Sequence, residues 1–145
     1  MPVRNFLGRN SDVVSSVIIP DSVSTIGMSA FSDCSSLKSI SIPDSVTEIG
    51  SGALSGCTSL TSIIILDSVI DMGQNTFSGC ASLTSITIPN SVTEIRYTVF
   101  ANCTSLSSVT IPDSVTSIGS RAFFGCTSLK NVEIPSSVVN NYYLA

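Results

Sequence analysis

The sequence predicts a right-handed solenoid of the α/β class, mostly β, in which a 23-residue unit is stacked about five times. Two independent markers carry this period, and columns of leucine and isoleucine share it. Prolines recur with one gap, where Leu66 takes the proline position, at Pro20, Pro43, Pro89, Pro112 and Pro135. Cysteines recur without a gap, at Cys34, Cys57, Cys80, Cys103 and Cys126.

The repeat sets the domain boundaries. Residues 14–138 form the predicted solenoid, with about five 23-residue repeats and a partial sixth. Residues 1–13 carry a degenerate half repeat around Phe6 and Leu7, and residues 139–145 form a C-terminal tail. Terminal units of solenoids usually present a polar outer face, and neither end of this sequence has that pattern. We therefore expect apolar edges that dock on other chains or on further units.

Each unit contains a short predicted strand, for example in residues 37–42. The apolar positions of this segment are Leu37, Ile40 and Ile42. The last two are β-branched and alternate with polar residues, which is typical of a strand with one buried face. Pro43 follows and ends the strand, because proline lacks the N–H that a ladder needs. A unit this short cannot bury its own apolar edge, so successive strands are expected to form a parallel sheet on the concave side.

The rest of each unit predicts a corner and one turn of helix. Val46 and Ile49 mark a second, weaker extended segment, and Gly50 permits a sharp turn after it. Arg96 takes this glycine position in a later unit and is expected to disturb the turn, because a residue with a side chain disfavours positive φ. Short segments such as residues 122–123 follow, and we expect single α or 3₁₀ turns there, on the convex side.

This pattern resembles the BspA-like family of leucine-rich repeats, whose unit reads Cys-x-x-Leu-x-x-Ile-x-Ile-Pro-x-x-Val-x-x-Ile-Gly-x-x-Ala-Phe. The resemblance extends over residues 14–138, with local departures at Leu54, Leu66 and Arg96. It implies a non-enzymatic adhesin, on a cell surface or secreted, that binds host matrix proteins or other cells. In the last full unit the matching residues are Ile111, Pro112, Val115, Ile118, Gly119, Ala122, Phe123, Cys126, Leu129 and Val132.

Composition disfavours two classes of partner. Charged residues make up 11% of the chain and the net charge is −4, so there is no basic surface for nucleic acid or anionic lipid. The longest aliphatic run, residues 63–66, is far shorter than the roughly 20 residues that span a bilayer, so we expect no membrane insertion. Residues 1–10 lack the apolar stretch of a signal peptide, so the location implied by the resemblance has no support in these residues.

The repeat also explains the candidate reactive groups. The cysteine spacing matches no zinc pattern and the chain has no histidine, so we expect no metal site, no cofactor, and buried, reduced thiols that fill the core. A serine nucleophile needs a base within reach, and the sequence shows no such arrangement. These observations favour a protein that is not an enzyme.

Acidic residues form two rows with the same period. For the row after the prolines, the structural interpretation is hydrogen bonding of the side chain to the turn backbone, and the functional one is a Ca²⁺ ion or a basic partner along the row. A second row, Glu48, Asp71 and Glu94, slightly favours the functional interpretation. The first row is Asp21, Asp44, Asp67, Asn90 and Asp113.

Outward-pointing strand residues are the strongest candidates for a binding surface, because a curved solenoid gathers them into one groove. Most carry small hydroxyl groups that cost little entropy to order and can bind protein or glycan, although they can also be mere soluble strand formers. The twelve candidates are Ser16, Ile18, Ser39, Ser41, Ser62, Ile64, Ser85, Thr87, Ser108, Thr110, Asn131 and Glu133. Two functions stay open: an adhesin-like module that binds protein or glycan, and a scaffold subunit docked permanently in a larger complex.

Overall fold

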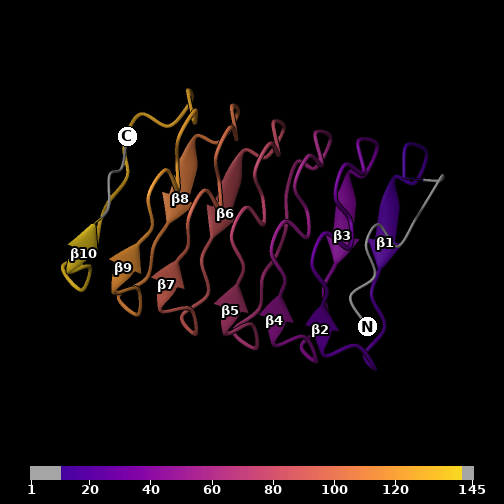
Figure 1. The fold of residues 1–145 in the computed structure, drawn as a ribbon, viewed down its shortest axis with the longest axis horizontal. Coiled ribbons are helices and arrows are strands. Elements are labelled where there is room, and N and C mark those ends of the chain that lie inside the picture. Colours follow the sequence, from indigo (N-terminus) through magenta and orange to yellow (C-terminus); the bar gives the residue numbers. More distant parts are fainter. Residues whose placement is uncertain (1–10, 142–145) are drawn as a thin grey trace.

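The computed structural model describes residues 11–141, which form a parallel β-solenoid whose coils stack along one axis (Figure 1). Its strands lie in two strips, seen in Figure 1 as an upper and a lower row. The first strip contains β1 (Ser16–Ile18), β3 (Ser39–Ser41), β6 (Ser85–Thr87) and β8 (Ser108–Thr110). The second strip contains β2 (Thr25–Ile26), β4 (Glu48–Ile49), β5 (Asp71–Met72), β7 (Glu94–Ile95), β9 (Ser117–Ile118) and β10 (Asn140–Asn141).

Strand pairing follows the 23-residue period in both strips. In the first strip Val17 of β1 lies opposite Ile40 of β3, and the pairing is parallel. In the second strip Glu48 of β4 lies opposite Asp71 of β5, again in parallel. The predicted stack of parallel strands is therefore confirmed, as is the weaker extended segment in the second half of each unit.

The core is made of columns of like side chains. Leu37, Leu60, Leu83 and Leu106 are fully buried, one from each successive coil. The rings of Phe77, Phe100 and Phe123 stack along the axis, with centroids 5.6 Å and 5.5 Å apart. Because each coil covers the apolar edge of its neighbour, burial is continuous along the stack.

The expected α or 3₁₀ turns do not form in the described residues, where the structure has no helix. The chain instead makes isolated turns, in which the N–H of Ala30 donates to the carbonyl of Gly27 (3.2 Å) and that of Cys34 to Phe31 (3.3 Å). Ser29 and Asp33 flank this segment with φ of 55° and 59°, and the equivalent positions of later coils also have positive φ. A left-handed residue at each side stops a helix from propagating, which the sequence pattern did not reveal.

The corner glycines are needed for a different reason from the predicted one. Gly50, Gly73 and Gly119 do not have positive φ. A Cβ on Gly73 would instead lie 2.3 Å from the Ser51 nitrogen, and one on Gly119 would lie 2.6 Å from the Tyr97 nitrogen. Neighbouring coils approach so closely at this corner that their main chains leave no room for a side chain.

Both strips are interrupted near the middle of the stack. Residues 62–65, predicted as a strand, are not one, and no hydrogen bond joins their main chain to either neighbouring coil. Residues 132–134 also lack the predicted strand. In the second strip β5 and β7 do not pair, and this is where Arg96 replaces glycine. The N–H of Gly73 donates to Ile49 at 2.8 Å, but the described residues show no equivalent bond from Arg96.

The turn side of the stack stays continuous across this interruption. The N–H of Leu54 donates to the carbonyl of Thr76 at 2.9 Å, and that of Phe77 donates to Val99 at 2.9 Å. The coils therefore stay joined along the turn side where the strand strips are interrupted.

The cysteines form a column of free thiols, of which the first four are buried, as predicted, and the last, Cys126, is half-buried. Each of the last four thiols donates to the carbonyl 26 residues earlier, for example Cys57 to Phe31 at 3.1 Å and Cys103 to Phe77 at 3.1 Å. Burial, which disfavours the charged thiolate, raises the pKa of Cys57 and of Cys103 to about 12. The column is a structural feature of the core and has no reactive thiolate at neutral pH.

Raising the pH above 9 is expected to destabilise the fold. The thiols of Cys57 and Cys103 titrate near 12 in the folded state against an ordinary value of 9.0, so the folded state binds more protons above pH 9. Their contribution to stability is complete below pH 9 and is lost as the pH rises toward 12. Urea midpoints measured between pH 7 and pH 11 should fall less steeply for a Cys57→Ala, Cys103→Ala variant. Equal slopes above pH 9 would show that other groups cause the loss.

Candidate binding surface

All twelve predicted surface residues are exposed, and they lie one above another along the first strip and its continuations. We call this set the strand face. The exposed fraction reaches 83% for Ile18 and 76% for Ile64, whereas the alternating residues Ile40 and Ile86 are buried. The predicted division between inward and outward side chains is therefore confirmed, including in the two coils whose strands are interrupted.

Hydroxyl groups on the strand face differ from hydroxyl groups elsewhere in the solenoid. Away from this face many of them donate to main-chain carbonyls of a neighbouring coil, as Ser45 does to Val23 (2.8 Å) and Ser114 to Val92 (2.8 Å). Within residues 11–141, no strand-face hydroxyl has a hydrogen-bond partner. Strand side chains stand perpendicular to the sheet and cannot reach the neighbouring main chain, so these groups stay available to a ligand.

A hollow of about 300 Å³ opens in the strand face between β3 and residues 62–66. It lies where the ladder is interrupted, and it brings together Ser41, Ser62 and Ile64 of the strand face. Leu66, the residue in the proline position, also lines it and is 38% exposed. Charged and aromatic side chains are absent from its lining among the described residues.

The acidic row after the prolines does not make the predicted bonds to its own turns. These turns are closed by the main chain, as where the N–H of Val46 donates to Pro43 at 3.2 Å. One carboxylate of the row has a partner in the next coil, because Asp67 accepts from the N–H of Asn90 at 3.0 Å. The row therefore joins neighbouring coils at one place.

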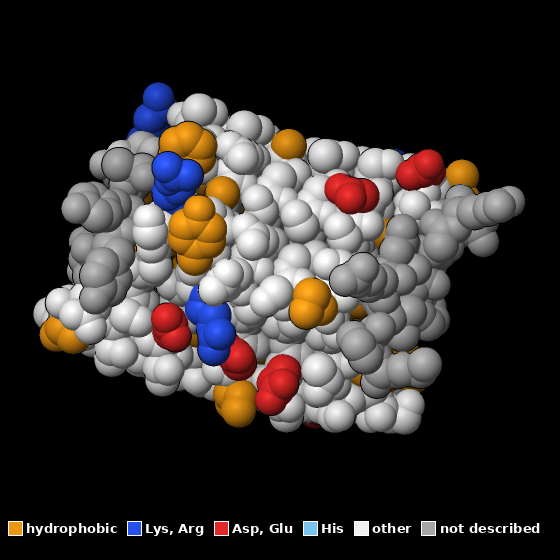
Figure 2. Space-filling model, viewed as in Figure 1, with side chains coloured by type: hydrophobic (Ala, Val, Ile, Leu, Met, Phe, Trp, Pro, Cys, Tyr) orange, Lys and Arg blue, Asp and Glu red, His pale blue; other side chains and the backbone are white. Residues whose placement is uncertain are grey.

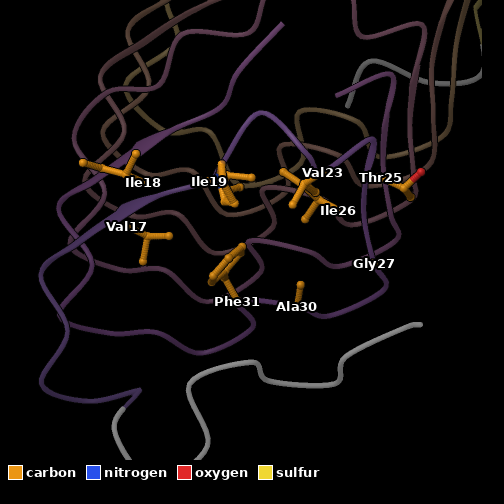
Figure 3. Close-up of a pocket in the computed structure, with 10 residues that line it drawn as sticks. Val17, Ile18, Ile19, Val23, Thr25, Ile26, Gly27, Ala30 and Phe31 are labelled. Carbon is orange, nitrogen blue, oxygen red and sulfur yellow. The ribbon is translucent and has the colours of Figure 1, made fainter. Parts of the chain in front are cut away.

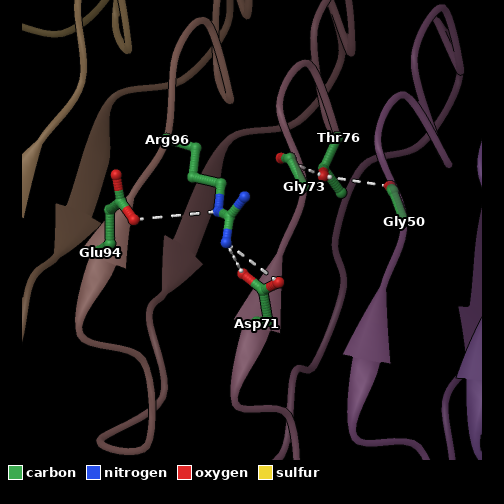
Figure 4. A network of polar contacts seen from close by, with 6 residues as sticks. All are labelled: Gly50, Asp71, Gly73, Thr76, Glu94 and Arg96. Carbon is green, nitrogen blue, oxygen red and sulfur yellow. Dashed lines mark hydrogen bonds and ion pairs between the residues drawn. The ribbon is translucent and has the colours of Figure 1, made fainter.

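The second acidic row contains its own counter-charge (Figure 4). The Arg96 guanidinium lies between two of its members, with Nη2 3.1 Å from Asp71 and Nε 3.9 Å from Glu94. The sequence pattern did not predict this ion pair, although Arg96 stands only two residues after Glu94 and lies in the coil next to that of Asp71. Residues 11–141 contain no group of three His, Cys, Asp or Glu side chains placed to hold a metal ion.

Figure 2 shows few charged side chains on the face in view, and in its lower part a Lys or Arg side chain lies among Asp and Glu side chains. Arg121 lies over the exposed ring of Phe124, 5.7 Å from its centroid. In residues 11–141 no helix has both the length and the hydropathy that crossing a bilayer requires.

An apolar pocket of about 290 Å³ lies at the β1 end of the described coils (Figure 3). Val17 and Ile19 line it from the first strip, Ile26 from the second strip, and Ala30 and Phe31 from the turn. These residues continue the core columns into the first described coil. The predicted half repeat around Phe6 and Leu7 falls largely outside the described residues.

Comparisons with known proteins agree on the repeat. Residues 6–123 and 93–144 match the model of the BspA type leucine rich repeat region, in six copies. A leucine-rich repeat protein from Bacteroides ovatus is 36% identical, with a TM-score of 0.79. The match covers 90% of this chain and 37% of that one, so the chain spans little over a third of that protein. No curated protein matches the chain.

Two further solved structures share the fold. The T. pallidum leucine-rich repeat protein is 28% identical, with a TM-score of 0.65, over 81% of this chain and 65% of its own. A leucine-rich repeat protein from Eubacterium ventriosum is 26% identical, with a TM-score of 0.68, over 92% of this chain and 45% of its own. The local departures from the repeat, rather than the repeat itself, therefore distinguish this chain.

Proposed function

The chain belongs to the BspA type leucine-rich repeat family, and from this premise we propose that it is a non-enzymatic, adhesin-like module that binds a protein partner through its strand face. Members of this class of repeat protein generally act in protein interaction. The observation that carries the proposal is the continuous row of unpartnered hydroxyl groups along one exposed face, whereas many hydroxyl groups elsewhere are bonded between coils.

Partner chemistry follows from the residues of the strand face. Ile18 and Ile64 supply exposed apolar area, and the hydroxyl groups around them both donate and accept hydrogen bonds. Glu133 is the only charged residue among the twelve, so charge contributes little to recognition. A glycan is the weaker candidate because the set contains no aromatic side chain on which a sugar ring can stack.

Replacing Ser39, Ser62, Ser85 and Ser108 by Arg is expected to abolish partner binding. Long charged side chains would cover the row and displace the partner, which should weaken capture from native extract by roughly tenfold or more. The matched control carries four Arg substitutions at exposed positions beside the second strip, Ser24, Thr47, Thr93 and Thr116. Recovery of the same partners by the strand-face variant, with both variants folded by circular dichroism, would refute the proposal.

A scaffold role is the second candidate, and the apolar pocket at the β1 end favours it. The apolar lining contributed by Val17, Ile19 and Ile26 could pack against an apolar edge of a neighbouring subunit. Sedimentation over a range of concentrations tests this role, because end contacts would raise the apparent mass with concentration. A monomer at every concentration would count against it.

A further inference from the structure

The hollow in the strand face lies beside main-chain groups that have no hydrogen-bond partner, although the equivalent groups are paired in the regular coils. In β1 and β3, and again in β6 and β8, parallel pairing uses the main chain of the strand. Between these pairs, residues 62–65 make no main-chain hydrogen bond to either side, although Ile63 and Ile65 keep their side chains in the core. The coil is therefore anchored by its buried side chains while its peptide N–H and C=O groups lack protein partners.

Departures from the repeat coincide in this coil. Leu66 stands where other coils have proline, so it has a main-chain N–H that proline lacks, and within residues 11–141 that N–H donates no hydrogen bond. Ile64 stands where the neighbouring coils have Ser41 and Thr87. In the same coil the buried hydroxyl of Ser68 has no hydrogen-bond partner, whereas Ser45 and Ser91 at the equivalent positions are bonded. This coil therefore contains both main-chain and side-chain polar groups that lack a protein partner.

We propose that this hollow binds an extended, uncharged peptide segment through its main chain, with an aliphatic side chain packed against Ile64 and Leu66. The inference rests on the proposed function and names the class of ligand at one part of the strand face. Unpaired peptide groups along a strand are complementary to another extended main chain, and alternate side chains of that peptide then reach the pocket.

The lining of the hollow excludes other classes of ligand. It contains no charged side chain to recognise a phosphate, a carboxylate or an amine, and no aromatic ring to stack on a sugar. Its volume of about 300 Å³ is at the small end of ligand pockets, which suits one aliphatic side chain and the adjoining peptide groups. Ser39, Ser41 and Ser62 can donate to peptide carbonyls at its rim.

The test uses a capped peptide with the sequence of residues 84–89, Thr-Ser-Ile-Thr-Ile-Pro, because it is uncharged and extended in its own context. Titration into ¹⁵N-labelled protein should give saturable shifts of the amides of residues 39–42 and 62–66. The same peptide with its main-chain nitrogens methylated cannot donate and should bind at least about tenfold more weakly. Equal binding of the methylated peptide, or shifts spread over other coils, would overturn the proposal.

Variants of one column separate this site from the rest of the strand face. Ile64→Arg should abolish the shifts, whereas Ile18→Arg, at the equivalent exposed position of the first coil, should leave them unchanged. Equal effects of the two variants would overturn the proposal. An uncharged oligosaccharide such as maltotetraose serves as a second probe, and its binding in the hollow in preference to the peptide would also overturn it.

Hydrogen exchange tests the premise directly. The amides of Ile63 and Ile65 should exchange at least about tenfold faster than those of Ile40 and Ile86, because they lack ladder bonds. Equal protection of the two pairs would overturn the proposal. If the peptide fails to bind while the four-Arg variant loses its partner, the inference fails alone. If the peptide binds while the four-Arg variant keeps its partner, the proposed function fails alone.

Discussion

Replacing Phe100 by Ala is expected to lower the free energy of unfolding by about 3–5 kcal/mol. Its side chain is fully buried, and its ring stacks between Phe77 and Phe123 at 5.6 Å and 5.5 Å. The substitution removes apolar contacts to the coils on both sides and leaves a cavity in the middle of the stack. Domains are stable by only about 5–15 kcal/mol, so the urea midpoint should fall by a large fraction.

Phe124→Ala is the matched control for this prediction. Phe124 follows Phe123 in the chain but is 50% exposed and contacts Arg121, so its loss should cost less than about 1 kcal/mol. The Phe100 variant also reports on cooperativity, because repeat stacks are held together by nearest-neighbour contacts. A change below about 1 kcal/mol for Phe100→Ala would mean that neighbouring coils close the cavity, contrary to a tightly packed column.

Most of the fold could be predicted because two independent rules apply to every coil. Alternation along each strand decides which side chains point inward, and the 23-residue repeat carries that decision from coil to coil. Burial of Ile40 and Ile86 and exposure of Ser41 and Thr87 follow from these two rules alone. The strand face was predictable for the same reason, although its role as a binding surface remains a proposal.

Features that depend on the distance between coils could not be predicted. The left-handed residues are only partly of this kind. Ser29, Thr98 and Arg121 give no sequence signal, whereas the column of Asp33 also contains Gly56, Gly79, Asn102 and Gly125, which are residue types that favour positive φ. The pairing of Arg96 with Asp71 crosses between coils and depends on their offset. The hollow beside Ile64 combines both effects, since only the structure shows that the ladder is interrupted there.

Replacing Gly73 by Ala is expected to lower the free energy of unfolding by roughly 2–3 kcal/mol. The new Cβ would lie 2.3 Å from the nitrogen and 2.6 Å from the Cα of Ser51, and these are main-chain atoms that cannot rotate away. The two coils must separate, which breaks the 2.8 Å bond from Gly73 to Ile49 and the pairing of β4 with β5. Thermal and urea unfolding of the variant measure this cost.

Variants at two further positions separate the effect of close approach between coils from the effect of backbone conformation. Gly79 has φ of 77°, but its nearest contacts to an added Cβ are 3.6 Å and 3.7 Å, so Gly79→Ala should cost only about 1–2 kcal/mol, through strain alone. Arg96 is the converse case, because its side chain already separates the coils. Arg96→Gly should therefore be more stable than Arg96→Ala, although glycine usually destabilises by about 0.5–1 kcal/mol relative to alanine. Both Arg96 variants lose the exposed ion pairs, so the difference in stability between them isolates the effect of the Cβ. If Arg96→Ala is instead the more stable variant, the Cβ is not what separates β5 from β7.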